Sequence, residues 1–341
     1  MNIKKCLSFE DVLIVPKFSE ITSRQNISLS SDLSSDITCN LPIISSPMDT
    51  VTESSMAAAI HDLGGLGVIH RYNTVEEQLE LLRAVGRSYN TAAAIGVSGD
   101  YLERAISLVN DGVKVLCVDI AHGHHALMRH ALGVLKNTFG TRVHIMAGNV
   151  ATLEAFNDLS DWGADSIRVG IGGGSICSTR IQTGHGMPTL QSVIDCSFSD
   201  RGTKIIADGG IKTSGDIVKA LAAGADFVML GSLLSGTDES PGAKIERNGL
   251  IYKEYRGMAS TRAQIGWRGN VSSREGVSAL VPYKGGVANV VKNLDAGIRS
   301  GLSYSGCTSI LEFQAKSEMI FQTSAGVSES HTHVFSSGIK F

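Results

Sequence analysis

The sequence contains no apolar run that approaches the length of a membrane-spanning helix, and no apolar signal core follows its first residues. Its 33 acidic and 30 basic residues nearly balance, so charge gives no reason to expect nucleic acid or a membrane as a partner. The six cysteines are scattered without a Cys-x-x-Cys pair, which argues against a structural zinc site or a disulfide framework. These absences favour a cytoplasmic enzyme.

Eight short apolar runs recur along the chain, separated by segments with a helical period. Continuous apolar runs of this length are typical of strands buried on both faces of a parallel sheet. Their alternation with amphipathic helices predicts an α/β fold of the (β/α)8 TIM-barrel type. A doubly wound sheet is the alternative, but no Gly-x-Gly-x-x-Gly turn follows the first run. The predicted strands span residues 42–46, 66–70, 92–97, 115–119, 143–149, 166–170, 205–209 and 227–232, and the predicted helices 74–85, 102–110, 125–138, 153–162 and 214–223.

We expect one catalytic domain at residues 1–321 and a Ser-, His- and Gly-rich tail at 322–341 that is mobile unless a partner orders it. Within the domain we expect an N-terminal arm without a strong period at 7–40, a hairpin strand at 250–253, a polar flap at 261–275 and a helix at 295–303.

Polar residues or glycines stand where most of the predicted strands end. In a (β/α)8 barrel these ends share the C-terminal rim, where active sites are built. The sequence therefore predicts that one rim brings together Ser46, His70, Asp119, Asn149, Gly170, Asp208 and Ser232.

The loop after the sixth predicted strand holds four glycines in the five positions from Gly170 to Gly174, and leads to Cys177. Glycines allow backbone with positive φ and a close approach to a ligand or ion. A cysteine on such a loop can act as a nucleophile towards a bound substrate. Cys177 is therefore the candidate nucleophile.

Two glycine turns close the last predicted strands, at residues 208–211 and 230–232. Loops at this place in a barrel often bind phosphate through backbone N–H groups, and the Asp208 carboxylate suits a ribose hydroxyl. His122, His124 and His125 do not fall on one helical face, so we expect capping or ligand stacking there rather than a metal site.

Several motifs together resemble the family of IMP dehydrogenases and GMP reductases. They are Gly-Ile-Gly-Gly-Gly-Ser-Ile-Cys-Ser-Thr-Arg at 170–180, Asp-Gly-Gly-Ile at 208–211, Tyr-Arg-Gly-Met at 255–258, Glu-Gly at 275–276 followed by Pro-Tyr-Lys-Gly at 282–285, Ser-Ser-Pro-Met-Asp-Thr-Val-Thr-Glu at 45–53 and Ala-Gly-Asn-Val at 147–150. They occur in the family's order and span residues 7–306, nearly the whole chain. The resemblance implies a (β/α)8 barrel, a homotetramer, and a purine nucleotide, GMP or IMP, lying over the rim.

The resemblance also implies roles for individual residues. The cysteine attacks C2 of the purine and forms a covalent adduct, with NADPH or NAD as the redox partner and a monovalent cation, K⁺, held by loop carbonyls. The catalytic residues are then Cys177, Thr179 and Glu275, and the cation ligands Gly172, Gly174 and Cys177. The nucleotide-binding residues are Ser46, Met48, Asn149, Arg168, Ser175, Asp208, Gly209, Gly210, Gly231, Ser232, Tyr255, Gly257 and Met258, and the cofactor-binding residues Asp119, Ala121, His122, Gly170 and Gly172.

Two activities within the family remain open, and the flap distinguishes them. The family's dehydrogenases carry an Arg-Tyr pair in the flap for hydrolysis of the adduct, and no such pair occurs at 259–274. Thr183-Gly184 is reductase-like, and only residues 86–91 stand where most dehydrogenases insert a regulatory module of the CBS type. The motif at 45–53 and Glu-Ser-His-Thr-His at 329–333 are dehydrogenase-like.

On balance the sequence predicts NADPH-dependent reductive deamination of GMP to IMP and ammonia. The alternatives are an IMP dehydrogenase that forms XMP with NAD and lacks the regulatory module, and a non-enzymatic nucleotide-binding barrel.

Overall fold

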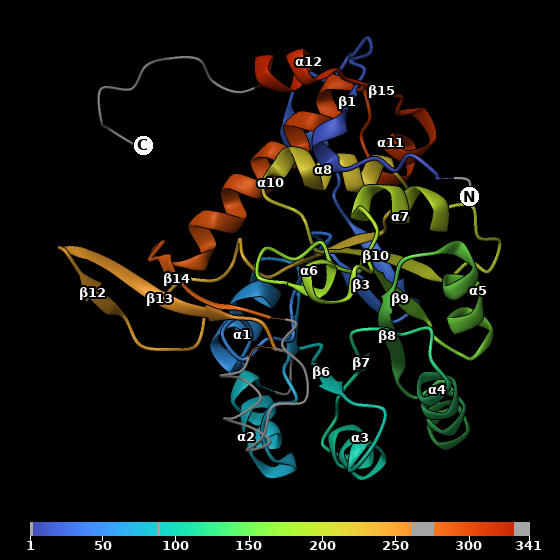
Figure 1. Cartoon of the computed structure of the whole chain (residues 1–341), viewed down its shortest axis with the longest axis vertical. Coiled ribbons are helices and arrows are strands. Elements are labelled where there is room, and N and C mark those ends of the chain that lie inside the picture. Colours follow the sequence, from blue (N-terminus) through green and yellow to red (C-terminus); the bar gives the residue numbers. More distant parts are fainter. Residues whose placement is uncertain (1–2, 87–88, 259, 261–275, 331–341) are drawn as a thin grey trace.

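Eight parallel strands form a closed barrel at the centre of the molecule, in the order β10-β11-β4-β5-β6-β7-β8-β9 (Figure 1). The computed structural model describes residues 3–86, 89–258, 260 and 276–330. Each barrel strand coincides with one predicted apolar run, so the (β/α)8 prediction is confirmed and the doubly wound alternative is wrong. The strands are β4 (Ile43–Ser45), β5 (Leu66–Ile69), β6 (Ala92–Ile95), β7 (Val115–Asp119), β8 (His144–Val150), β9 (Ser166–Val169), β10 (Lys204–Asp208) and β11 (Phe227–Leu230).

The apolar runs are continuous because both faces of each strand are buried. Side chains such as Val68, Met146 and Phe227 belong to one buried cluster, and their neighbours along the strands belong to another that includes the helices. The first cluster also takes in Leu33 and Ile37 from a hairpin of β2 (Ser31–Ser34) and β3 (Ile37–Cys39), so this part of the N-terminal arm packs against residues of the barrel strands.

Helices surround the barrel, and the five predicted between the strands are present. Thr74 caps α2 as its sequence predicts: the Thr74 hydroxyl accepts from the Glu77 N–H at 3.2 Å, and the Glu77 carboxylate accepts from the Thr74 N–H at 2.8 Å. The first eight helices are α1 (Ser54–Asp62), α2 (Val75–Val85), α3 (Tyr101–Asn110), α4 (Ala126–Phe139), α5 (Leu153–Asp161), α6 (Thr179–Thr183), α7 (Thr189–Cys196) and α8 (Ser214–Ala222).

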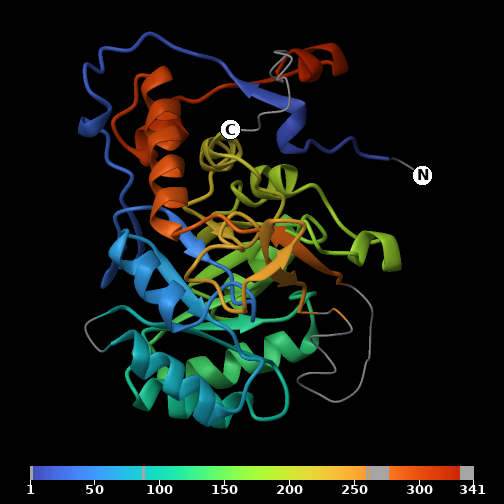
Figure 2. The ribbon, with the colours of Figure 1, turned by 90° about the vertical axis from the view of Figure 1, so that its left-hand side faces the viewer.

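Segments near the two ends of the described chain lie side by side (Figure 2). Strand β1 (Val12–Ile14) pairs antiparallel with β15 (Met319–Phe321). Short 3₁₀ helices η1 (Phe9–Asp11) and η2 (Arg24–Asn26) flank β1, and α10 (Val287–Tyr304), α11 (Ile310–Lys316) and α12 (Ser324–Glu329) complete the C-terminal part. Helix α10 packs on α8 and is longer than predicted. Among the described helices, none has both the length and the apolar character to cross a membrane.

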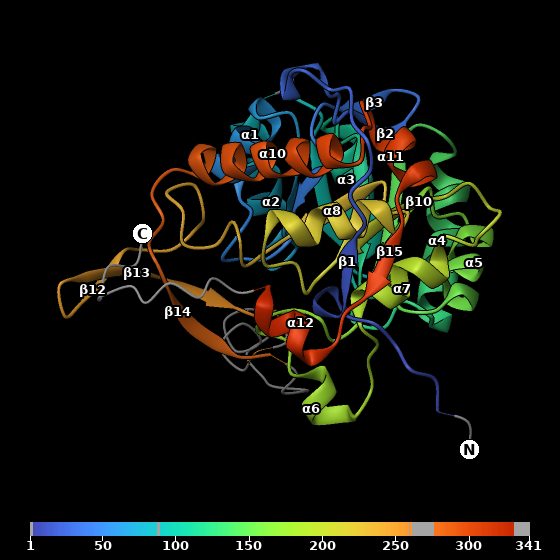
Figure 3. The same ribbon diagram turned by 90° about the horizontal axis from the view of Figure 1, so that it is seen from above.

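A separate antiparallel sheet projects from the barrel (Figures 1 and 3). It consists of β12 (Ile245–Arg247), β13 (Leu250–Arg256) and β14 (Ser278–Pro282). The buried Lys253 ammonium on β13 donates to the carbonyl oxygen of Thr237 at 2.9 Å and also to that of Ser240, and Lys284 donates to the Ser232 carbonyl at 2.7 Å. These contacts tie the sheet to the segment after β11. The predicted flap at 261–275 follows β13 in sequence and lies outside the described residues.

Candidate active site

A pocket of about 300 Å³ opens on the C-terminal rim of the barrel. Its lining contains every predicted catalytic, nucleotide, cofactor or cation residue that the structure describes except His122; Glu275 lies outside the described residues. His70, predicted to share the rim with the other strand ends, is also not in this lining. The predicted residues that it brings together are Ser46, Met48, Asp119, Ala121, Asn149, Arg168, Gly170, Gly172, Gly174, Ser175, Cys177, Thr179, Asp208, Gly209, Gly210, Gly231, Ser232, Tyr255, Gly257 and Met258.

The cysteine loop, residues 170–177, needs glycine at its start. Gly170 has φ of 148°, and a Cβ there would stand 2.0 Å from the Asp208 carbonyl oxygen. Only glycine permits β9 and β10 to approach so closely at this point. The loop then turns, with the Cys177 N–H donating to the Gly174 carbonyl at 3.1 Å.

Cys177 is half-buried, and its thiol donates to the Thr179 hydroxyl oxygen at 3.2 Å. The loop is also held to the projecting sheet, because the Val277 N–H donates to the Ile176 carbonyl at 3.1 Å. The nucleophile candidate is therefore positioned from two sides, by α6 and by the chain leading into β14.

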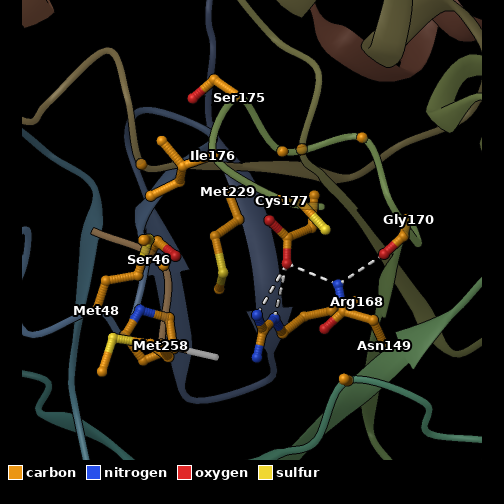
Figure 4. A pocket seen from close by; sticks show the side chains of 18 of the residues that line it. Ser46, Met48, Asn149, Arg168, Gly170, Ser175, Ile176, Cys177, Met229 and Met258 are labelled. Carbon is orange, nitrogen blue, oxygen red and sulfur yellow. Dashed lines mark hydrogen bonds and ion pairs between the residues drawn. The ribbon is translucent and has the colours of Figure 1, made fainter. Parts of the chain in front are cut away.

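A buried guanidinium forms the floor of the pocket (Figure 4). Arg168 on β9 donates through Nη1 to Asp119 Oδ1 at 2.6 Å, and through Nη2 and Nε to Asp208 Oδ2 at 2.9 and 3.1 Å. Asn149 Nδ2 adds a bond of 2.8 Å to the same Asp208 oxygen and one of 3.0 Å to the Gly170 carbonyl. The network fixes the Asp208 carboxylate beside the cysteine loop.

Burial and charge act in opposite directions on these groups. Burial alone would raise the pKa of Asp119, but the guanidinium groups of Arg168 and Arg71 hold it below its ordinary value. Burial likewise opposes the charge on Arg168, and Asp208 with Asp119 more than offsets it, so the pKa of Arg168 is raised. The floor therefore carries fixed charges at neutral pH.

The predicted phosphate side lies between the ends of β10 and β11. Gly209 and Gly210 both have positive φ, of 94° and 79°. A Cβ at Gly231 would stand 3.0 Å from the Tyr255 hydroxyl oxygen, so this glycine leaves room between the turn and the ring. Burial raises the pKa of Tyr255 to about 12, against a hydrogen bond with Ser175, so its hydroxyl stays protonated and can donate.

Methionines contribute the apolar part of the pocket: Met48, Met229 and Met258 line it with Ile176 (Figure 4). Met258 is fixed from the segment after β4, because the Asp49 N–H donates to its sulfur at 3.4 Å. Arg256 Nε also binds the Asp49 carboxylate at 2.9 Å. Such polarizable side chains suit contact with a flat aromatic ring.

The pocket continues towards the opposite side of the rim. In the closed strand order β6 stands across from β10, and the strands flanking β6 supply Arg71, Tyr72, Asp119 and Ala121 to the lining. Arg71 Nη2 donates to the Asp119 carbonyl at 3.1 Å. Sequence reasoning missed Arg71 and Tyr72, although they directly follow the strand end at His70.

The histidine segment lies beside this part of the pocket and not in its lining. His124 Nε2 is 2.8 Å from Asp158 Oδ2, and its ring stacks on Trp162 with 5.9 Å between centroids. Burial and the neighbouring histidines lower the pKa of His122. The His125 side chain caps α4, accepting from the Leu127 N–H at 3.0 Å. Capping is thus observed here, and His124 stacks on a protein ring. Ligand stacking in this segment and a cofactor contact of His122 stay predictions.

Comparison with known proteins places this geometry in a family. A family model for the IMP dehydrogenase / GMP reductase domain matches residues 6–333. Inosine-5'-monophosphate dehydrogenase of Nitrosopumilus maritimus is 36% identical, over 98% of this chain and 99% of the relative. That alignment spans 472 positions, so the relative carries residues with no counterpart among the 341 here. GMP reductase of Leishmania major is 33% identical, over 96% of each protein.

A solved structure supports the same grouping. GMP reductase from Trypanosoma brucei, a cysteine-to-alanine variant in complex with guanosine 5'-monophosphate, superposes with a TM-score of 0.91 and 31% identity, over 98% of this chain and 99% of that one. The family match thus covers the barrel, the cysteine loop and both glycine turns of the pocket. The chain belongs to the IMP dehydrogenase / GMP reductase family of oxidoreductases.

Proposed function

We propose that the protein is a GMP reductase: GMP, NADPH and two protons give IMP, NADP⁺ and ammonium. The observation that carries the proposal is the Cys177 thiol at 3.2 Å from the Thr179 hydroxyl, on a pocket whose flap sequence has no Arg-Tyr pair. Cys177 can form the adduct and Thr179 can move a proton. The Arg-Tyr pair that activates water in the family's dehydrogenases is missing from the flap sequence.

The nucleotide is held at both ends in this proposal. Its phosphate lies on the backbone N–H groups of Gly210 and Gly231 with the Ser232 and Tyr255 hydroxyls, and its ribose on the Asp208 carboxylate. Its purine contacts Met48 and Met258, with C2 towards Cys177. Arg168 and Asn149 keep Asp208 in place through the bonds described above.

Cys177 then supplies the covalent step. Its sulfur bonds to C2, ammonia leaves C2 with a proton delivered by Thr179 and Glu275, and the sulfur–carbon bond later breaks to give back the thiolate. NADPH, when bound, supplies the hydride that replaces the amino group. Arg71, Tyr72, Asp119 and Ala121 would hold it, because they line the pocket across the rim from the phosphate turn and present both cationic and aromatic groups.

K⁺ is part of the proposal, with backbone carbonyls of Gly172, Gly174 and Cys177 as ligands. Glycine backbone can turn several carbonyls towards one point, and hard oxygen ligands suit this ion. The Gly174 carbonyl also accepts the Cys177 N–H. A cation bound to this carbonyl would therefore help to hold the turn that carries Cys177. A homotetramer is also proposed, and exposed apolar side chains on the projecting sheet, at Ile245, Leu250 and Ile251, support self-association.

IMP dehydrogenase is the second candidate. The 36% identical Nitrosopumilus maritimus protein bears that name, as does a 39% identical relative from Cryptosporidium parvum. In that case NAD oxidises IMP, and a residue other than an Arg-Tyr pair activates the water that hydrolyses the adduct.

Absorbance of the reduced nicotinamide distinguishes the two reactions. We expect GMP to drive NADPH consumption with stoichiometric ammonium, and IMP with NAD to give little NADH beyond one turnover. Cys177→Ala should abolish both signals, whereas Cys6→Ala, at the other cysteine that is not fully buried, should leave them unchanged. Steady NADH formation from IMP at a rate matching or exceeding the GMP reaction would replace the reductase assignment by the dehydrogenase.

A further inference from the structure

Thr189, the first residue of α7, stands under both loops of the nucleotide site. Its hydroxyl oxygen is 2.6 Å from the point that a Cβ of Gly173 would occupy, and 3.3 Å from the corresponding point at Gly170. A Cβ on Gly210 would lie 3.6 Å from the Thr189 hydroxyl oxygen and 3.5 Å from the Gly173 carbonyl oxygen. One side chain therefore supports the cysteine loop and the predicted phosphate turn together.

The Thr189 hydroxyl is buried and has no hydrogen-bond partner among the described residues. Thr189 is 4% exposed, and its Oγ1 atom is inaccessible to solvent. Two other helical threonines donate to the carbonyl four residues earlier, Thr138 to Val134 and Thr183 to Thr179, both at 2.8 Å. Thr189 has no such acceptor because the helix begins at this residue, after the Pro188 cap.

A buried hydroxyl without a partner destabilises the fold that contains it, and valine would fill the same volume without that cost. The first turn of α7 is itself fixed, since Gln191 exchanges two hydrogen bonds with Leu7, at 3.1 and 3.2 Å. The element that can adjust to meet the hydroxyl is thus the glycine loop above it.

We propose that Thr189 is a positioning residue: in the nucleotide-bound protein its hydroxyl donates to the Gly173 carbonyl. This bond holds the cysteine loop in the conformation that presents Cys177 and Ser175 to the nucleotide. The proposal rests on the proposed function for the identity of the nucleotide site. It does not depend on the direction of the reaction.

Three variants in the Cys177→Ala background test it, so that no covalent chemistry intervenes. Thr189→Val removes the hydroxyl and keeps the shape, and Thr189→Ser keeps the hydroxyl. Ser192→Ala, one turn further along α7, removes another buried hydroxyl that has no partner among the described residues, and Ser192 is not part of the pocket lining. The melting temperature of each free protein and its dissociation constants for GMP and IMP are measured by calorimetry.

Thr189→Val should melt at or above the temperature of its parent and bind GMP about three- to tenfold more weakly, because one hydrogen bond of the complex is lost. Thr189→Ser should restore the affinity, and Ser192→Ala should bind as its parent does. Unchanged GMP and IMP affinities in Thr189→Val would overturn the proposal, as would equal losses in Ser192→Ala. A parent protein that binds neither nucleotide would instead remove the proposed function itself.

Discussion

Replacement of Arg168 by methionine should destabilise the protein by about 3 kcal/mol, the lower end of the range for breaking a buried ion pair. The Arg168 side chain is 7% exposed, and those of Asp119 and Asp208 are 17% and 15% exposed. Methionine keeps most of the apolar contact but leaves two carboxylates on the pocket floor without their shared cation. The expected loss of stability stays at the lower end because each carboxylate retains a partner. The Arg71 guanidinium lies 3.6 Å from the Asp119 carboxylate, and the Asn149 amide donates to Asp208 at 2.8 Å.

Urea unfolding of matched variants measures this cost. Arg201→Met is the control, since Arg201 binds Asp161 at 3.2 Å but is 37% exposed, and such solvent-screened surface pairs contribute little to stability. Adding Asp208→Asn to Arg168→Met should restore part of the stability, because it removes one of the unpaired charges. If both arginine variants lose the same small amount, the floor network does not stabilise the fold and our account of the site is wrong.

The pH dependence gives a second check on the same variant. The pKa of Asp119 is lowered from 3.8 in the folded protein. Its contribution is therefore fully present above its unfolded pKa and is lost only as the pH falls through the lower folded value. In Arg168→Met burial is no longer offset by this guanidinium and raises the pKa of Asp119, so the destabilisation relative to wild type should be largest near about pH 8 and should decrease as the pH falls towards about 5. A destabilisation that stays constant over that interval would assign it to another group.

Three further predictions concern separate parts of the structure. Iodoacetamide should label Cys6 and Cys177, the two cysteines that are not buried, and GMP should protect only Cys177 in peptide mass spectrometry; equal protection of both would place the nucleotide elsewhere. Burial lowers the pKa of His144 to about 4, so between pH 6.5 and 4 the unfolded chain binds a proton that the folded protein does not. The free energy of unfolding of the wild type should therefore fall by on the order of 2–3 kcal/mol over this range. If His144→Asn loses stability just as steeply over the same range, His144 is not the group responsible. Lys253→Met should leave buried carbonyls unpaired and lower the free energy of unfolding by about 1–3 kcal/mol. The projecting sheet should also be cleaved earlier in limited proteolysis. Lys204→Met, at a part-exposed lysine, should show neither effect.

The eight barrel strands were predictable because burial on both faces gives each a local signature. Five of the described helices were not predicted: α1, α6, α7, α11 and α12. Glu53 and Pro188 stand at the cap positions of α1 and α7 and give no side-chain cap. Helices α11 and α12 do have side-chain caps, from Ser309 and Thr323, but each has only six or seven residues, too short for a clear helical period. The pairing of Val12 with Phe321 joins segments some 300 residues apart, and nothing in the local pattern of either specifies that register.

The strand-end part of the candidate site was predictable for a topological reason: parallel strands place their C-terminal residues on one rim, so strand ends alone gather Asp119, Asn149 and Asp208. Positions beyond the strand ends, such as Ser175, Tyr255 and Met258, came from the resemblance to the family. Contacts that depend on depth below the rim were not predictable. The sequence does not show that Arg168 bridges two carboxylates, nor that the Thr189 hydroxyl is buried under the cysteine loop without a partner among the described residues.

The projecting sheet has a consequence for how new chemistry could arise on this scaffold. The segment between β13 and β14 distinguishes the two activities in our proposal, yet both strands belong to a sheet that shares no strand with the barrel. That sheet is held through lysine–carbonyl contacts and through backbone bonds to the cysteine loop. Insertions or exchanges between these strands can therefore accumulate without altering the barrel's hydrogen bonding. In our proposal, a flap grafted from a dehydrogenase would redirect the adduct that Cys177 forms on the barrel.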